Sequence, residues 1–188
     1  MSKTAPLYIP SATGADAVAA SELDHVPWET LAHAYGVGAA KAHGNVRASL
    51  ASLADDVGGA ADELFGNICH QGTTYEATAY AVPYIAAFAA GADLDEDGYV
   101  AIASLLATIG HSASFEAPSG SHWGSFGEGV GPRTREAFRA CGQHLRAFTK
   151  RHPRFAPIDA ALIELGESTT PDEALVEELE ELAYGDEE

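Results

Sequence analysis

Residues 66–88, GNICHQGTTYEATAYAVPYIAAF, constrain the fold more than any other part of this chain. One helical segment ends near Cys69, a four-residue corner follows, and a second segment carries apolar side chains at spacings of three and four. Gly72 permits a backbone conformation that other residues resist, and Thr73 with Glu76 has the spacing of a helix capping box. The stretch therefore predicts two helices packed together across a tight corner.

The same helical spacing recurs along most of the chain, and no strand pattern stands out. Alanine dominates an apolar fraction of 46%, and β-branched residues are sparse, which favours helices over strands. The predicted helices cover 27–35, 39–53, 57–69, 74–89, 96–112, 132–151, 157–165 and 171–183. Pro83 predicts a kink or a break in the fourth, and Thr170 with Glu173 predicts a capping box before the last. The chain is predicted to be all-α, a single domain of about seven to nine helices.

Three segments depart from this pattern. Residues 1–22 are predicted to form an irregular N-terminal arm before a helical domain at 23–184, and residues 185–188 form an acidic tail. The Gly- and Ser-rich stretch 113–131 is long for a connection inside a compact domain, which marks it as a functional or mobile loop. No membrane span or signal peptide is predicted, and two cysteines are too few for a disulfide scaffold, so we expect a cytoplasmic protein.

The chain carries a net charge of −18, from 28 acidic and 10 basic residues. Such a molecule repels nucleic acid and attracts basic partners, although a salt-rich cytoplasm or a need for solubility also produces acidic proteins. Seven of the basic residues lie within 133–154, whereas the chain beyond Glu164 is acidic with no basic residue. Either the acidic last helix compensates the basic one, or the two form a bipolar binding surface.

Three motifs around the corner point to a family. They are Trp28-x-x-Leu31-x-His33-Ala34-Tyr35-Gly36, then Gly66-Asn67-Ile68-x-His70-Gln71-Gly72-Thr73-x-Tyr75-x-Ala77-Thr78, and Ala81-Val82-Pro83-Tyr84. Over residues 24–112 the chain resembles bacterial HEAT-repeat-like proteins, which are common in actinobacteria. The resemblance implies an α-α superhelix in which paired helices stack and expose a concave face. Most members of the family have no assigned activity, and some related helical arrays act as immunity or interaction proteins beside toxin genes.

His70 and Gln71 are the polar centre of the corner. They are candidates for a ligand, a general base or a partner contact, or else they satisfy backbone groups left open at two helix ends. Cys69 next to His70 does not form a nucleophile–base pair by position, because adjacent helical residues point about 100° apart. We expect Cys69 to be a buried packing residue.

An acidic run lies before the fifth predicted helix. Asp93, Asp95 and Asp97, followed by Gly98, have the spacing of the first half of a calcium-binding loop. Ser104 occupies the twelfth position and cannot supply the bidentate carboxylate that completes such a site. An acidic loop that caps the following helix explains the run equally well.

Trp123 and Phe126 stand among glycines and serines in the 113–131 stretch. Exposed aromatic side chains on a loop are good anchors for a partner, and the alternative is an aromatic plug folded back onto the helices. None of the eight histidines has metal-ligand spacing, and 127–131 is glycine-rich but follows no strand, so no cofactor or metal is predicted.

These observations favour a non-enzymatic protein-binding module, and the most specific form of the hypothesis is an immunity protein that neutralises a basic toxin. The predicted partner-binding residues are His70, Gln71, Asp93, Asp95, Asp97, Trp123 and Phe126. One alternative is a general scaffold or a self-associating helical-repeat protein. Another is a nucleic-acid base-excision enzyme on a helical array, for which the basic helix is the only support.

Overall fold

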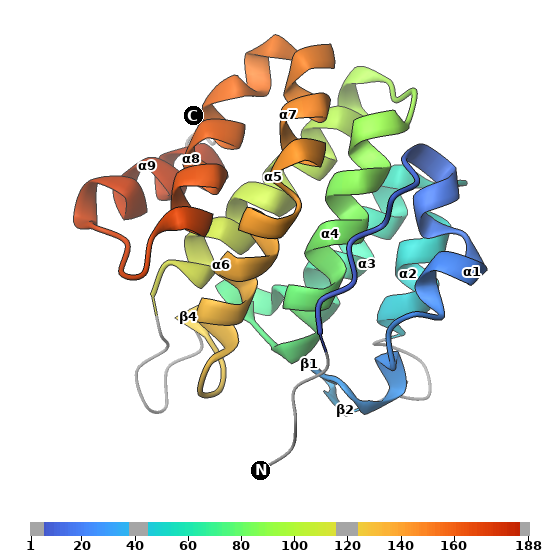
Figure 1. Ribbon diagram of the computed structural model, residues 1–188, viewed down its shortest axis with the longest axis horizontal. Coiled ribbons are helices and arrows are strands. Elements are labelled where there is room, and N and C mark those ends of the chain that lie inside the picture. Colours follow the sequence, from blue (N-terminus) through green and yellow to red (C-terminus); the bar gives the residue numbers. More distant parts are fainter. Residues whose placement is uncertain (1–5, 38–44, 116–123, 185–188) are drawn as a thin grey trace.

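The computed structural model describes residues 6–37, 45–115 and 124–184 (Figure 1). Within these ranges nine α-helices pack together in one domain, which confirms the predicted all-α class. They are α1 Ala20–Leu23, α2 Val46–Ser52, α3 Val57–Ile68, α4 Glu76–Gly91, α5 Glu96–Ala113, α6 Val130–Ala140, α7 Gly142–Arg151, α8 Ala156–Glu167 and α9 Glu173–Tyr184. Short 3-10 helices lie at Gly14–Val18, Trp28–Thr30, His70–Gly72 and Pro153–Phe155. The pairing of these helices into HEAT-type repeats stays a prediction.

Helix α4 lies at the centre of the domain, and nearly all of its side chains are buried. It packs against α6 and α7 on one side and against the N-terminal 3-10 helix and α2 on others. Seven of its residues are alanine, so neighbouring helices can approach it closely from several directions. The helix continues through Pro83, so the predicted break does not occur.

Side chains bond carbonyls at or just after the C-terminal ends of four helices. Carbonyls in the last turn of a helix have no partner within that helix, and leaving them buried and unpaired costs free energy. Side-chain donors from other elements reach such carbonyls in three of the helices. For the fourth helix, the donor reaches the carbonyl of the residue just after it. The pairs are Tyr84 with Glu22 at α1, Thr78 with Ile68 at α3, Arg151 with Ala92 after α4, and Arg135 with Ala113 at α5. The tertiary packing thus depends on polar bonds as well as on the apolar core.

The N-terminal segment runs along α4, as the dark-blue trace in Figure 1 shows. The His144 ring bonds the carbonyl of Pro10 at 2.9 Å, which fastens this segment to α7. Gly14 and Gly91 bring two backbones into close contact, since a Cβ on Gly91 would lie 2.5 Å from the Gly14 nitrogen. The predicted irregular arm therefore packs on the domain from Leu7 onward.

The predicted helix at 27–35 is wrong. The chain makes a single 3-10 turn at Trp28–Thr30 and then a hairpin in which β1 (Ala32–His33) pairs antiparallel with β2 (Gly36–Val37). The Trp28 indole donates to the carbonyl of Leu23, and the Ala34 amide donates to the carbonyl of Asn67 on α3. These contacts hold the segment out of a helix despite its helical spacing.

The predicted helix at 132–151 is interrupted. The backbone leaves helical geometry at Cys141, and α6 and α7 follow one another around that residue. Arg135, which the periodicity placed on the exposed basic face, is 9% exposed because its guanidinium bonds Ala113 and, at 3.2 Å, the Thr169 carbonyl. Arg135 is therefore not part of the exposed basic surface on which the base-excision hypothesis depends.

Two predicted capping boxes are also wrong. Thr73 lies in a short strand, and Thr78 takes the capping role by accepting a hydrogen bond from the Tyr75 amide at 2.8 Å. Before the last helix, the Asp172 carboxylate, rather than Thr170, accepts from the Leu175 amide at 3.0 Å.

Candidate functional site

The corner between α3 and α4 contains a strained backbone position. Among the residues that the structure describes, Gln71 is the only one other than glycine with a positive φ. Gln71 has φ 52° and ψ 39°, and Gly72 follows with φ 72°. A left-handed conformation costs a residue with a side chain roughly 1–2 kcal/mol. Gln71 is exposed and His70 is half-buried, so both side chains reach the surface at this corner. Strain of this kind often marks a binding site.

A parallel ladder ties the corner to the segment before α6. Strand β3 (Thr73–Thr74) pairs with β4 (Gly124–Ser125), a ladder that the sequence analysis did not predict. The Phe126 amide donates to the carbonyl of Thr74 at 2.8 Å, and the Thr74 and Ser125 hydroxyls bond each other at 3.2 Å. The ladder therefore fixes the position of Phe126, the residue that follows β4.

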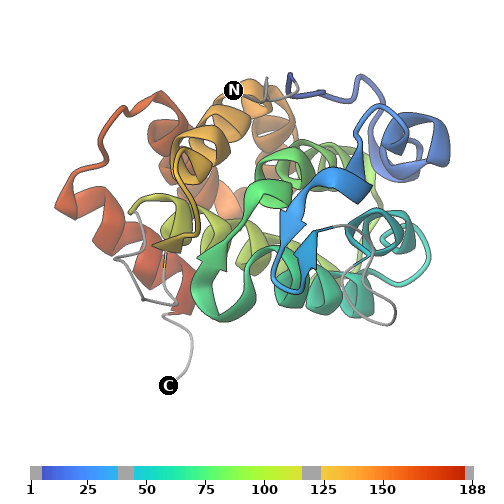
Figure 2. The same ribbon diagram turned by 90° about the horizontal axis from the view of Figure 1, so that it is seen from below.

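Two pairs of aromatic rings lie around this corner, and we call Tyr35, His70, Tyr75 and Phe126 the corner face. The Tyr35 ring lies 5.9 Å from that of His70, and the Tyr75 ring lies 5.9 Å from that of Phe126. Tyr35 is 49% exposed and Phe126 is 62% exposed. Figure 2 views the molecule from this end and shows the short strands that lie next to these residues in the chain.

A pocket of about 450 Å³ opens beside the corner face, and we call it the Tyr80 pocket. Tyr80 and Phe126 provide aromatic walls, and the Arg133 guanidinium lies 5.7 Å from the Tyr80 ring centroid. Two exposed carboxylates, from Glu76 and Glu128, also line it. The pocket thus offers apolar surface beside two carboxylates and one guanidinium, and that guanidinium pairs with Glu136.

Cys69 lies behind the corner and is fully buried. Its sulfur is 3.6 Å from the Ser112 hydroxyl, and burial raises the pKa of the thiol to about 12. A thiol with this pKa is protonated at neutral pH and is not a nucleophile. The expected packing role of Cys69 agrees with this environment.

The acidic run is far from the corner face, at the opposite end of α4 (Figure 1). The Asp95 carboxylate accepts from the Gly98 amide at 2.9 Å and caps α5. Asp93 lies 3.9 Å from Arg151, and Glu96 bonds Arg154. No group of three or more possible metal ligands occurs in the part of the chain that the structure describes.

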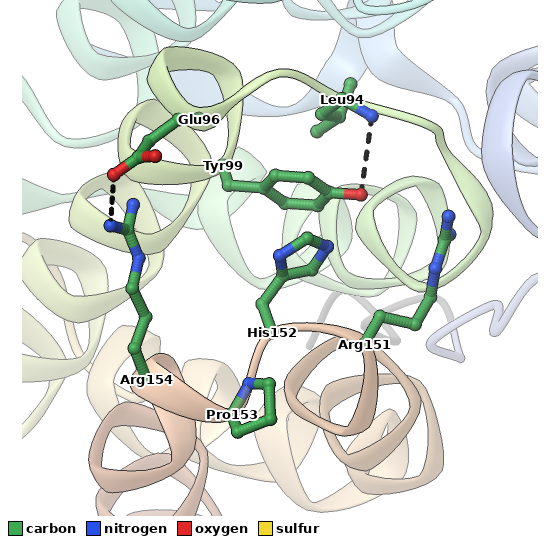
Figure 3. Close-up of a pocket in the computed structure, with 7 residues that line it drawn as sticks. All are labelled: Leu94, Glu96, Tyr99, Arg151, His152, Pro153 and Arg154. Atoms are coloured by element: carbon green, nitrogen blue, oxygen red, sulfur yellow. Dashed lines mark hydrogen bonds and ion pairs between the residues drawn. The ribbon is translucent and has the colours of Figure 1, made fainter.

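A pocket of about 380 Å³ separates the acidic run from the end of α7 (Figure 3). The His152 ring lies against the Tyr99 ring at a tilt of 36°, with the ring centroids 3.2 Å apart. Burial and the nearby Arg151 and Arg154 lower the pKa of His152. Arg151 already donates to the Ala92 carbonyl at 2.7 Å, and Arg154 bonds Glu96. Because both arginines are engaged within the protein, the pocket is not built to hold an anion.

A third concavity of about 580 Å³ lies where α5, α8 and α9 meet, and we call it the α9 groove. Apolar side chains from α5 and α8 line it, and α9 adds Leu182, Glu178 and Glu181. The helix α9 carries five glutamates, and no ion pair within 4 Å reaches any of them in the described ranges. The basic helices instead pair with Asp93, Glu96 and Glu136, so α9 does not compensate them through ion pairs.

The structure brings three of the seven predicted partner-binding residues together. His70 and Gln71 lie at the corner, and the β3–β4 ladder ties Phe126 to the same corner. The acidic run follows the other end of α4, and Trp123 lies outside the described residues. The sequence does not indicate that Tyr35 belongs to the corner face, because the spacing of its neighbours predicts a helix there. Gly36, directly after Tyr35, is the only sequence signal for a turn there.

Within the described ranges, no helix combines the length and the apolar character that a membrane span requires. No family model, no curated protein and no solved structure matches this chain.

Proposed function

We propose that this protein is a non-enzymatic protein-binding module that contacts its partner through the corner face. The exposed aromatic cluster beside the Tyr80 pocket carries this proposal. Tyrosine and other aromatic residues dominate binding energy at protein interfaces, where they insert into pockets or receive partner side chains. Exposed aromatic clusters are otherwise unfavourable in water, which supports a role in recognition.

The partner that fits this surface is a basic protein. The chain carries a net charge of −18, and Glu76 and Glu128 place part of that charge beside the aromatic walls. A lysine or arginine of the partner can lay its aliphatic stem on Phe126 and direct its charge to these carboxylates. Long-range attraction would also accelerate the encounter.

The most specific form of the proposal is an immunity protein that neutralises a basic toxin encoded beside it. The environment of Cys69 supports a binding role over catalysis, since the one cysteine next to a histidine is buried and its pKa is about 12. A buried protonated thiol cannot act on a substrate.

The product of the neighbouring gene is the probe that tests this proposal. We expect it to bind the purified protein, with affinity that falls as salt rises, and Phe126→Ala or Tyr35→Ala to weaken binding by about ten-fold or more. Gln143→Ala, an exposed neutral change on α7, is the matched control and should leave the affinity unchanged. Equal affinities for all variants would rule out the corner face as the contact surface.

Self-association through the same aromatic cluster is the second candidate function, because an exposed apolar surface can also pair with a copy of itself. Sedimentation of the purified protein distinguishes the two. A stable dimer that Phe126→Ala converts to a monomer would favour the self-associating scaffold over a heterologous partner.

A further inference from the structure

The α9 groove is a second surface with the features of a docking site, and it lies apart from the corner face. Its floor is apolar, formed by Val100 and Ala103 of α5 with Ile158 of α8. Val100 is 43% exposed, which makes it one of few large apolar side chains at the surface of the described ranges. Ala103 and Ile158 are buried, so the apolar surface that solvent reaches in the groove comes from Val100 and Pro157, with the half-buried Phe155 and Leu182.

Carboxylates border one side of this floor. Glu178 and Glu181 of α9 line the groove together with Leu182, one turn after Glu178. Neither glutamate has an ion-pair partner within 4 Å in the described ranges. Arg154 also lines the groove, but its guanidinium already bonds Glu96. The charge on the α9 side is thus uncompensated within the described structure.

The shape of the groove favours a helical occupant. The lining residues of α5 and of α9 recur at spacings of three and four, so each of the two helices presents one face to the groove. An amphipathic helix places its apolar residues at the same spacings and can lay that stripe into such a groove. Lysine or arginine residues beside the stripe would then meet Glu178 and Glu181.

We propose that the α9 groove binds an amphipathic helical segment of a partner protein, with an apolar stripe flanked by basic residues. Charge complementarity selects this occupant, because an acidic or neutral helix would leave the carboxylates of α9 without partners. The groove is independent of the corner face, so the proposal holds or fails separately from the proposed function.

A synthetic peptide tests this inference directly. The probe is a helix-forming peptide of about 14 residues with leucines at i, i+3, i+4 and i+7 and lysines between them. A scrambled peptide of the same composition, with no apolar stripe, measures attraction by charge alone. We expect the amphipathic peptide to bind about ten-fold more tightly than the scrambled one.

Variants of the groove residues show where the amphipathic peptide binds. Glu178→Gln with Glu181→Gln should weaken binding of the amphipathic peptide by about ten-fold, and Val100→Ser should also weaken it. Glu173→Gln with Glu177→Gln removes the same charge from α9 outside the groove and should have a much smaller effect. Phe126→Ala should have none, which separates this result from the test of the corner face.

Three results would overturn the inference: no binding of the amphipathic peptide, equal binding of the scrambled peptide, or equal losses for the two pairs of glutamate variants. The second and third would show diffuse attraction to an acidic protein. Circular dichroism of each variant confirms that α9 remains folded.

Discussion

Arg135 illustrates how a single residue joins three elements of this fold. Its guanidinium donates to the Ala113 carbonyl at the end of α5 and to the Thr169 carbonyl in the loop between α8 and α9. Hydrogen bonds from a charged donor are stronger than neutral ones, and the loss of this one leaves the carbonyl of the buried Ala113 without the guanidinium. The residue therefore stabilises tertiary packing rather than an exposed basic face.

Arg135→Met is expected to lower the free energy of unfolding by about 2–3 kcal/mol, because it keeps the apolar stem and removes both hydrogen bonds. Arg139→Met, an exposed change on the same helix, is the control and should cost less than about 1 kcal/mol. Urea denaturation of both variants measures the difference. Equal effects would show that the two carbonyls find other partners.

The two buried thiols predict a loss of stability at alkaline pH. Burial raises the pKa of Cys69 and of Cys141 to about 12, whereas an unfolded thiol ionises near 8.5. Because the pKa values of the folded state are higher, this contribution is complete below about pH 8.5 and is lost as pH rises toward 12. At pH 10 the loss should be on the order of 1–2 kcal/mol per thiol.

Thermal melts between pH 7 and 10.5 measure this effect. The double variant Cys69→Ala, Cys141→Ala provides the control and should show a flatter decline with pH than the original protein. In a second measurement, a thiol reagent at pH 8 should label neither cysteine until the protein unfolds. Rapid labelling of the folded protein would contradict the burial of these thiols.

At the scale of elements, the acidic run before α5 is explained by helix capping. Asp95 accepts the Gly98 amide at 2.9 Å, while Glu96 and Asp97 occupy the first turn, where negative charge is favourable. The same spacing that imitates half of a calcium loop therefore has a structural purpose. The absence of a twelfth-position carboxylate in the sequence agrees with this interpretation.

Asp95→Ala should lower the free energy of unfolding by about 1 kcal/mol through the loss of the cap. Asp97→Ala, in the first turn of α5 with no capping bond, should cost roughly half of that or less. Millimolar calcium is expected to leave the melting temperature of the unmodified protein unchanged. A clear rise with calcium would show that the run binds the ion.

At the scale of the whole molecule, charge repulsion opposes folding. The net charge is −18, and the glutamates of α9 have no ion pair within the described ranges. Salt shortens the distance over which these charges repel one another, from about 30 Å at 0.01 M to about 10 Å at 0.1 M. The folded state should benefit more than the expanded unfolded chain.

The melting temperature is accordingly expected to rise by several degrees when sodium chloride is raised from about 0.01 M to about 0.5 M. Replacing Glu177 and Glu180 by glutamine should reduce this dependence, because it removes part of the repulsion. A melting temperature that falls with salt would show instead that the exposed ion pairs, such as Arg47 with Asp24, dominate.

The helices that the sequence predicted well have their signals close by. Helix α3 begins at Val57 after the capping Asp56, and α5 begins at Glu96 after Asp95, each within a residue of the prediction. Capping is a bond over three residues, so the local sequence contains it. The corner face is only partly predictable. The sequence marks His70, Gln71 and Phe126 as polar or aromatic loop residues, but it does not show that they lie close together.

By itself the sequence determined the all-α class, the corner after α3 and the acidic character of the surface, since these follow from local spacing, turn chemistry and composition. Only the tertiary structure decided that a 3-10 turn and a hairpin replace the predicted helix at 27–35, that Arg135 is buried and that Phe126 lies against Tyr75. Each of these outcomes depends on hydrogen bonds or ring contacts between residues more than 20 positions apart in the chain. Local propensity amounts to less than about 1 kcal/mol per residue, so such long-range contacts override it.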